Sequence, residues 1–276
     1  MEFVFKRTYR GPLKAVLLDW AGTTMDYGCL APAVAFREVF KRRGVEITID
    51  EARAPMGAHK KVHIRQITQN ENVARRWEQA HGHRPGEADV EAMFEDFIPL
   101  QLRCLAQYAD LIPGTLAAVA ECRRRGLKIG STTGYTGEMM ALLAEEAKRR
   151  GYAPDSTVCA TQVPAGRPHP YMCWQNAINL QTYPLEAFVK IGDTLPDIEE
   201  GLNAGMWTVG LAKTGNEMGL SETEVAALEP AVREARLARA GKRLRQTGAH
   251  YVVDSVADIV PILDAINARL ATGERP

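Results

Sequence analysis

The chain has 276 residues, of which 46% are hydrophobic, 25% charged and 7% aromatic. This composition is that of a globular protein and excludes a disordered, collagen-like or fibrous chain. Lys plus Arg and Asp plus Glu both number 34, so the formal net charge is zero and there is no overall basic field to attract nucleic acid or an anionic membrane.

Short apolar runs alternate with helical stretches along most of the chain. Runs with the length and composition of buried strands are Ala15–Trp20, Leu127–Thr133, Phe188–Gly192, Trp207–Leu211 and Tyr251–Val253. Strands that alternate with helices are typical of a parallel sheet covered by helices. More than a hundred residues separate the first two runs, which is too long for one crossover connection.

The long intervening segment has the pattern of several helices. One is predicted to begin around Pro32 and to end near Gly44, and a second to begin at the capping box of Thr48 and Glu51. Further helices are predicted over Lys60–Ile67, over Val73–Ala80 and from Glu87 to about Ala109. The simplest architecture is an α/β fold, with a Rossmann-like parallel sheet interrupted after its first strand by an inserted α-helical cap.

The predicted domain organisation follows from this interruption. We assign residues 1–28 to the core, 29–105 to the helical cap and 106–276 to the remainder of the α/β core. A capping box at Ser221 predicts a helix that continues into the basic stretch Arg233–Arg245, which we interpret as a solvated helix face because acidic residues are interspersed.

Cysteine usage bears on the cellular compartment. The five cysteines are scattered and none belongs to a C-x-x-C pair, so neither a disulfide framework nor a thiolate zinc site is predicted. No apolar run approaches the roughly 18 residues that a bilayer span requires. We therefore expect a cytoplasmic protein without membrane or nucleic-acid partners.

Polar residues follow the first predicted strand. Asp19 stands where the apolar run ends, and the small residues of 21–24 form a turn whose backbone could approach an anion closely. In an open parallel sheet, ligands bind beyond the carboxyl ends of the strands. Asp19 is therefore a candidate metal ligand or nucleophile.

Two later strands end in a similar way. Gly130–Gly134 supplies hydroxyls and glycines suited to phosphate oxygens, with Thr133 as the candidate donor. Asp193 ends another apolar run and Asp197 follows four residues later, so that with Asp19 they would form a hard oxygen site suited to Mg²⁺. Arg167 could supply the cation beside a phosphoryl group.

These elements, in this order, resemble the haloacid dehalogenase superfamily of aspartyl phosphotransferases. The resemblance implies that Asp19 is the nucleophile, Thr133 the phosphate-binding hydroxyl and Arg167 the balancing cation. It also implies that Asp193 is a Mg²⁺ ligand and that Asp197 acts from the outer coordination sphere.

One position departs from the phosphatases and mutases of that superfamily, which usually have a second Asp two residues after the nucleophile. Here that position is Ala21, so the acid that protonates an oxygen leaving group is missing. A carbon leaving group would need an electron sink instead. Lys60, which follows the Gly57 break and precedes His63 by one helical turn, could supply it by condensing with an aldehyde.

Taken together, the motifs resemble the phosphonoacetaldehyde hydrolase (phosphonatase) family over nearly the whole chain. The matching motifs include Asp-Trp-Ala-Gly-Thr-Thr at 19–24, Pro-Met-Gly at 55–57 with Lys60 and His63, and Val-Pro-Ala-Gly-Arg-Pro at 163–168. In that family the residue equivalent to Ala21 offers its backbone carbonyl to Mg²⁺, and the cap lysine forms a Schiff base.

The resemblance implies hydrolysis of the P–C bond of phosphonoacetaldehyde to acetaldehyde and phosphate. Lys60 would form the Schiff base and Asp19 the aspartyl phosphate, in a homodimeric enzyme of 2-aminoethylphosphonate degradation. His63 and Tyr135 are candidates for proton handling, and hinges near Gly28 and around 101–110 would close the cap. The expected substrate-binding residues are Gly22, Cys29, Met56, Gly57, Gly134 and Tyr135.

Three other functions remain open at this point. In a phosphomonoester phosphatase or mutase of the same superfamily, Lys60 would only grip the substrate, and Ala21 argues against that role. A non-catalytic phosphate- or metabolite-binding protein would retain the pocket without turnover. An aldolase-type lyase that uses Lys60 alone leaves the aspartates unexplained.

Overall fold

The computed structural model describes residues 8–276, and in this part of the chain six parallel strands form one sheet in the order β3-β2-β1-β4-β5-β6. Residues 1–7, which belong to the first predicted core segment, lie outside the described residues. The strands are β1 (Ala15–Leu18), β2 (Lys128–Thr133), β3 (Ser156–Cys159), β4 (Phe188–Gly192), β5 (Trp207–Leu211) and β6 (Tyr251–Val253).

The five predicted strands are confirmed, but the expected sheet was wrong in omitting β3. This edge strand has only four residues, Ser-Thr-Val-Cys, and half of them are polar, so it lacks the apolar run by which the others are recognised. The central strand β1 is fully buried and pairs with β2 on one side and β4 on the other. The loop after β1 therefore lies at the middle of the sheet's carboxyl edge.

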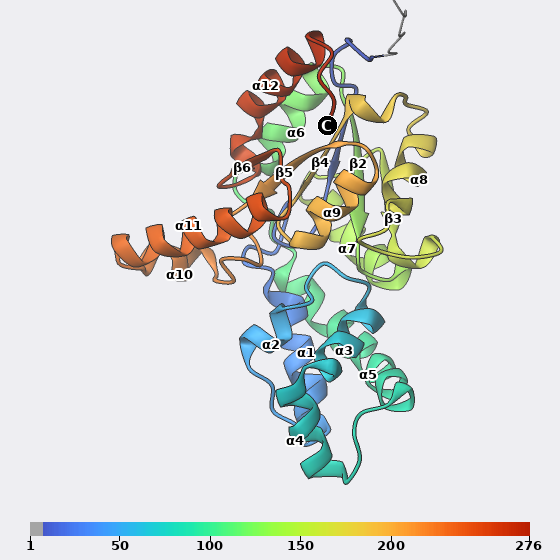
Figure 1. Ribbon diagram of the computed structural model, residues 1–276, viewed down its shortest axis with the longest axis vertical. Helices are drawn as coiled ribbons and strands as arrows, with labels where there is room; N and C mark the ends of the chain where they lie inside the picture. Colours follow the sequence, from blue (N-terminus) through green and yellow to red (C-terminus); the bar gives the residue numbers. More distant parts are fainter. Residues whose placement is uncertain (1–7) are drawn as a thin grey trace, which may run out of the picture.

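Helices cover both faces of the sheet (Figure 1). The helices α6 (Thr115–Arg124) and α12 (Ile259–Ala271) pack together on one face. The other face carries α8 (Tyr171–Asn179), α9 (Leu195–Asn203) and α11 (Pro230–Gln246). Within residues 8–276, no helix combines the length and the apolar character needed to cross a membrane.

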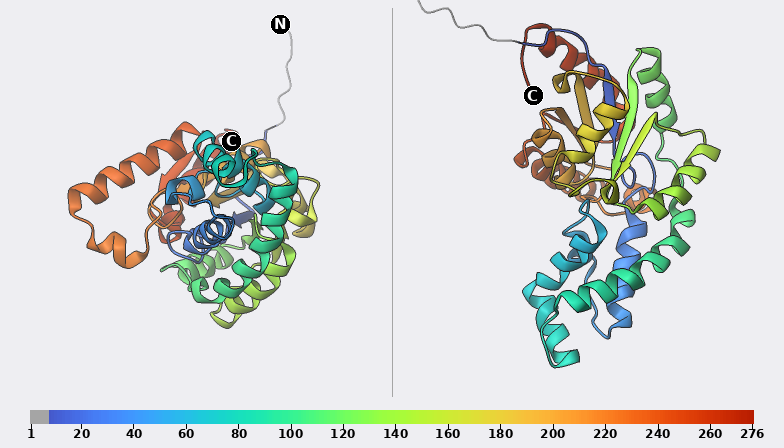
Figure 2. Two further views of the ribbon diagram at one scale, coloured as in Figure 1. Left: turned by 90° about the horizontal axis from the view of Figure 1, so that it is seen from below. Right: turned by 90° about the vertical axis from the view of Figure 1, so that its right-hand side faces the viewer.

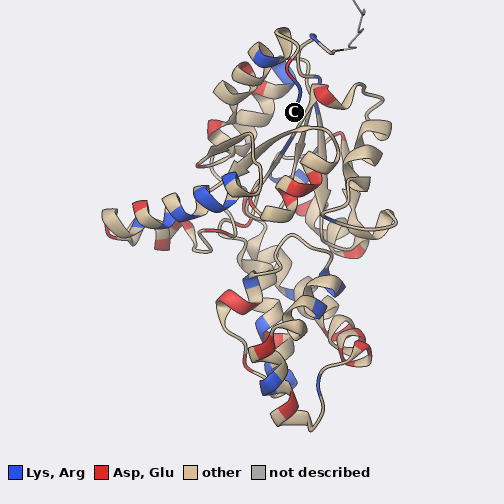
Figure 3. Ribbon diagram, in the orientation of Figure 1, with Lys and Arg blue, Asp and Glu red and all other residues tan. Residues whose placement is uncertain are grey.

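The basic segment is not the continuation of the helix that begins after Ser221, as the sequence had suggested. The short helix α10 (Glu222–Ala227) ends first, and α11 begins afresh with Pro230 in its first turn. Proline lacks the backbone N–H that an uninterrupted helix needs, and it fits a first turn well. The predicted solvated face is confirmed, because α11 extends from the core with its Lys and Arg residues largely exposed (Figures 2 and 3).

The predicted helical insertion is confirmed between β1 and β2, where it forms a separate lobe in Figure 1. Its last helix ends earlier than predicted, at Leu105, and a short 3₁₀ turn follows. The limits of the cap at 29 and 105 stay a prediction. The helices of this lobe are α1 (Leu30–Arg42), α2 (Ile49–Arg53), α3 (Lys60–Gln69), α4 (Glu71–His81) and α5 (Glu87–Leu105). The core helix α7 (Gly137–Arg149) packs against α5.

Aromatic side chains form the core of this lobe. Phe36 stacks on Phe97 with ring centroids 4.5 Å apart, and Phe40 meets Trp77 edge to face at 6.4 Å. All four rings are buried. These rings form the cap part of a hydrophobic core that continues into the sheet domain.

Replacing Phe40 by Ala should destabilise the cap by about 3–5 kcal/mol, because it leaves a cavity beside Trp77. The matched control is Val34→Ala on the same helix, where the side chain is 48% exposed and the expected change is below about 0.5 kcal/mol. Urea unfolding together with hydrogen exchange of cap amides measures both. Equal losses in the two variants would contradict the assignment of Phe40 to the cap core.

Candidate active site

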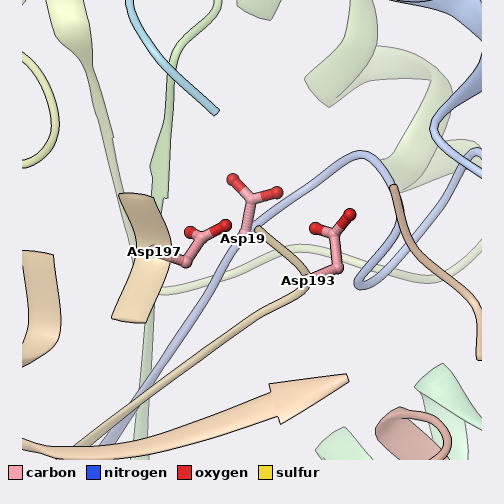
Figure 4. A group of neighbouring side chains, drawn as sticks. All are labelled: Asp19, Asp193 and Asp197. Carbon is pink, nitrogen blue, oxygen red and sulfur yellow. The ribbon is translucent and has the colours of Figure 1, made fainter. Parts of the chain in front are cut away.

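Three carboxylates meet at the carboxyl edge of the sheet (Figure 4). Asp19 follows β1, Asp193 follows β4, and Asp197 lies in the first turn of α9. Because β1 and β4 are paired parallel strands, their ends coincide. Carboxylate oxygens of the three residues lie within 4.8 Å of one another, and all three side chains are buried.

The turn after Asp19 is shaped by the approach of Asp193. Gly22 has φ of +84°, and a Cβ there would lie 2.3 Å from Asp193 Oδ2, so glycine is required on both counts. The Thr23 hydroxyl donates a hydrogen bond to Asp193 Oδ1 at 3.1 Å, and the Asn216 backbone N–H donates to Oδ2 at 2.8 Å. The metal-ligand candidate is thus fixed by the turn after Asp19 and by the loop after β5.

Two buried cations balance part of this negative charge. Arg167 Nη2 donates to Asp19 Oδ1 at 2.7 Å and lies 3.0 Å from Asp197 Oδ1, while its Nε donates to Glu200 at 2.9 Å. Lys190 Nζ lies 2.5 Å from the same Asp197 oxygen. Asp197 therefore forms ion pairs with two cations, and its outer-sphere role stays a prediction.

The negative charge of these carboxylates is not fully balanced by Arg167 and Lys190. Burial raises the pKa of both Asp19 and Asp193, with neighbouring carboxylates adding to the effect. Burial acts in the same direction on Asp197, but Arg167 and Lys190 outweigh it and hold its pKa below the usual range. Within the described chain no Lys or Arg forms an ion pair with Asp193. Hard carboxylate oxygens with this unbalanced charge fit Mg²⁺.

The cap contributes Lys60, the first residue of α3. Its side chain is buried, and its amine lies over the ring of Tyr135 from the core, 4.5 Å from the centroid. Burial lowers the pKa of Lys60 to about 8, although Cys29 and Asp19 act in the opposite direction. Its neighbour Lys61, by contrast, points outward and pairs with Glu91.

His63 lies one turn further along α3, with its ring stacked on Phe36 at a centroid distance of 3.7 Å. Its Nε2 is 2.8 Å from the Ala52 carbonyl, so Nε2 donates and Nδ1 is an acceptor without a partner in residues 8–276. Burial and the charge of Lys60 hold the pKa of His63 well below its usual range. The side chain is neutral, and its role in proton handling stays a prediction.

The cap and the core meet in very close contact. A Cβ on Gly57 would lie 2.3 Å from the Thr194 hydroxyl, and one on Gly134 would lie 2.6 Å from the Ala58 carbonyl. Both glycines therefore permit the two domains to enclose a small cavity. It is lined by Asp19, Ala21, Cys29, Pro32, Met56, Gly57, Lys60, Thr133, Gly134, Tyr135, Arg167 and Thr194.

Most of the predicted site residues thus line one cavity, while Gly22, His63, Asp193 and Asp197 lie outside its lining. Sequence reasoning missed Pro32 and Thr194, which follow from the way the domains meet. It also missed Lys190 and Glu200. Lys190 could have been identified from the sequence, because it stands within the apolar strand Phe188–Gly192 and a buried charge needs a partner of opposite charge.

Comparisons with known proteins agree with this geometry. A family model described as haloacid dehalogenase-like hydrolase matches residues 13–205. A phosphonoacetaldehyde hydrolase of Nitratidesulfovibrio vulgaris is 52% identical, covering 99% of this chain and 98% of its own length, and one of Bacillus cytotoxicus is 47% identical, covering 92% and 96%. The crystal structure of a phosphonoacetaldehyde hydrolase-like protein from Oleispira antarctica superposes with a TM-score of 0.98 at 43% identity and full coverage of both chains.

The Lys60 amine is expected to titrate near pH 8, far below the value of about 10.4 for an ordinary lysine. NMR of protein labelled with ¹³Cε-lysine follows each amine through a pH titration without chemical modification. One resonance should shift with a midpoint about pH 8 and should vanish in Lys60→Arg. If every lysine resonance titrates above pH 10, the proposed neutral amine does not exist.

Proposed function

The chain belongs to the haloacid dehalogenase-like hydrolases and, within them, to the phosphonoacetaldehyde hydrolase family, and we propose that it hydrolyses phosphonoacetaldehyde to acetaldehyde and phosphate. The family predicted from the sequence motifs is thereby confirmed. The finer mechanism is inferred from the chemistry of the site.

One observation carries the proposal. A buried lysine amine from the cap and a buried carboxylate from the core, those of Lys60 and Asp19, line the same cavity. Breaking a P–C bond leaves an electron pair on carbon, which water or a simple acid does not stabilise. An amine that condenses with the aldehyde can accept this pair, and the carboxylate can attack phosphorus.

The first step forms the imine. The neutral Lys60 amine adds to the aldehyde carbon, water leaves, and the resulting iminium carries the positive charge on nitrogen. The lowered pKa supports this step, because a neutral amine is required for the addition. His63 and Tyr135 are the proposed proton carriers at this nitrogen.

The second step breaks the P–C bond. An Asp19 oxygen attacks phosphorus in line, and the electron pair of the P–C bond moves into the iminium to give an enamine. Protonation of the enamine carbon and addition of water then release acetaldehyde and the free amine. A second water hydrolyses the aspartyl phosphate, so the net reaction consumes one water and yields phosphate.

The core residues support charge dispersal at phosphorus. Mg²⁺ bound by Asp19, Asp193 and the Ala21 carbonyl would supply positive charge beside the transferring oxygens, with Asp197 in an outer position. Arg167 already contacts Asp19, and the Thr133 hydroxyl accepts a hydrogen bond from the Tyr135 N–H at 3.1 Å, which orients it at the strand end. Because the leaving group is an enamine carbon, no acid is needed at position 21.

Closure of the cap over the core would exclude water from this chemistry. The two proposed hinge segments run side by side, since the Asp26 N–H donates to the Asp110 carbonyl at 3.1 Å. Gly28 adopts φ of +86°, and a Cβ there would lie 2.4 Å from the Leu220 carbonyl. Cys29, Met56, Gly57 and Gly134, which line the cavity, would then enclose the substrate.

We also propose that the enzyme is a cytoplasmic homodimer acting in the breakdown of 2-aminoethylphosphonate. All five cysteines have free thiols, which supports a reducing compartment. Assembly and pathway follow the family resemblance.

Lys60→Arg keeps the charge but cannot form an imine, so it should abolish release of both acetaldehyde and phosphate from phosphonoacetaldehyde. Sodium borohydride added with substrate should fix an adduct on Lys60 of the wild type. Lys61→Arg is the matched control and should retain turnover and trapping, because Lys61 points outward. Equal products from Lys60→Arg and wild type would rule out the Schiff base.

Asp19→Asn should lower phosphate release by several orders of magnitude, as expected when a nucleophile is lost. Imine formation does not use Asp19, so borohydride should still trap substrate on Lys60. The measurement compares phosphate release with mass spectrometry of the trapped protein. Unimpaired turnover in this variant would remove Asp19 from the role of nucleophile.

A further inference from the structure

Arg53, the last residue of cap helix α2, extends its side chain into the core. The residue is 8% exposed, and its Nη1 donates to the Gly28 carbonyl at 2.8 Å and to Asn216 Oδ1 at 3.1 Å. No carboxylate in residues 8–276 forms an ion pair with it. Burying a guanidinium that has only carbonyl oxygens as partners costs free energy of folding. Neutralisation of a neighbouring charge therefore does not explain this contact.

The core partner of Arg53 also holds Asp193. Asn216 directs its side-chain oxygen to Arg53 and its backbone N–H to Asp193 Oδ2, at 2.8 Å. Its side-chain amide further approaches the Arg53 carbonyl at 3.5 Å. One residue therefore links the cap to the carboxylate that is the candidate metal ligand.

The loop around Asn216 fits closely against both ends of this link. A Cβ on Gly215 would lie 2.1 Å from Asp193 Cβ, and one on Gly219 would lie 3.1 Å from the Arg53 guanidinium carbon. The Thr214 carbonyl accepts a hydrogen bond from the Gly28 N–H at 2.7 Å. The loop packs closely against Asp193 at one end and against Arg53 at the other. We therefore expect a movement of the Arg53 side chain to shift the loop and, with it, the Asp193 carboxylate.

We propose that Arg53 is a positioning residue that couples closure of the cap to the orientation of Asp193 through the loop 214–220. With the cap closed, Arg53 fixes Asn216, and the Asn216 N–H directs one oxygen of Asp193. When the cap opens, this constraint is lost. The inference rests on the proposed function only in taking Asp193 as a Mg²⁺ ligand.

This arrangement makes coupling reciprocal. If closure orders Asp193 for the cation, then Mg²⁺ bound there favours the closed cap by the same factor. The side-chain contacts of Arg53 in this link all come from its Nη1, which also reaches the Cys29 carbonyl at 3.4 Å.

The test measures Mg²⁺ affinity by calorimetry on the full-length protein without substrate. Arg53→Met removes the cap side of the link, and Asn216→Ala removes the side-chain oxygen but keeps the backbone N–H. Each should weaken Mg²⁺ binding about tenfold, the scale of a lost outer-shell contact. The double variant should be no weaker than either single variant, because both remove the same interaction.

Arg76→Met is the matched control. Arg76 is also a cap arginine that contacts α2, through Glu51 at 2.6 Å, but it does not touch the core. Its Mg²⁺ affinity should equal that of the wild type. Hydrogen exchange at the Asn216 amide should accelerate several-fold in Arg53→Met and not in this control, and Arg53→Leu serves if Arg53→Met does not fold.

Unchanged Mg²⁺ affinity in a folded Arg53 variant would overturn the proposal, as would independent, multiplying effects in the double variant. Absence of Mg²⁺ binding by the wild type would also overturn it, because Asp193 would then not be a metal ligand. Neither measurement uses phosphonoacetaldehyde. Failure to hydrolyse that compound would therefore be recognised separately from failure of the coupling.

Discussion

Four buried carboxylates at one edge of the sheet are the constraint on which the rest of the site depends. Asp19, Asp193, Asp197 and Glu200 repel one another in a poorly solvated space, and within residues 8–276 Arg167 and Lys190 are the cations that form ion pairs with this group. Glu200 receives Arg167 Nε and the Thr132 hydroxyl, and so holds the guanidinium with its other end toward Asp19. The excess charge is located at Asp193, beside the proposed nucleophile, which is where a divalent cation is useful.

The position of the helical insertion turns this charged edge into a closed site. Because the insertion begins directly after the loop that follows Asp19, short hinges suffice to bring the start of α3 over Asp19. The Gly57 backbone packs against the Thr194 side chain and the Gly134 backbone against the Ala58 carbonyl, so no side chain at either glycine holds the domains apart. The amine and the carboxylate are thus supplied by separate rigid elements and meet only where these elements touch.

The sequence predicted those parts of the molecule that depend on local pattern. The strand ends at Asp19 and Asp193 were identified because an apolar run followed by Asp is visible without a structure. The edge strand β3 was not, since its four residues carry no periodic signal, and the break before Pro230 was hidden by the continuous basic stretch. Glu200 could not be assigned because its partners Thr132 and Arg167 are distant in sequence. Arg53 and Asn216 could not be assigned because only the arrangement of cap and core brings them together.

The environment of Lys60 suits both of the charge states that the proposed reaction needs. Burial disfavours the ammonium, and a position at the start of α3, where the helix dipole is positive, acts in the same direction. The Tyr135 ring face and the charge of Asp19 act in the other direction and favour a cation. A pKa about 8 is the balance, and it leaves part of the amine neutral near pH 7. Once the amine has condensed, the iminium keeps its charge, and the same ring and carboxylate then stabilise the electron sink next to the bond that breaks.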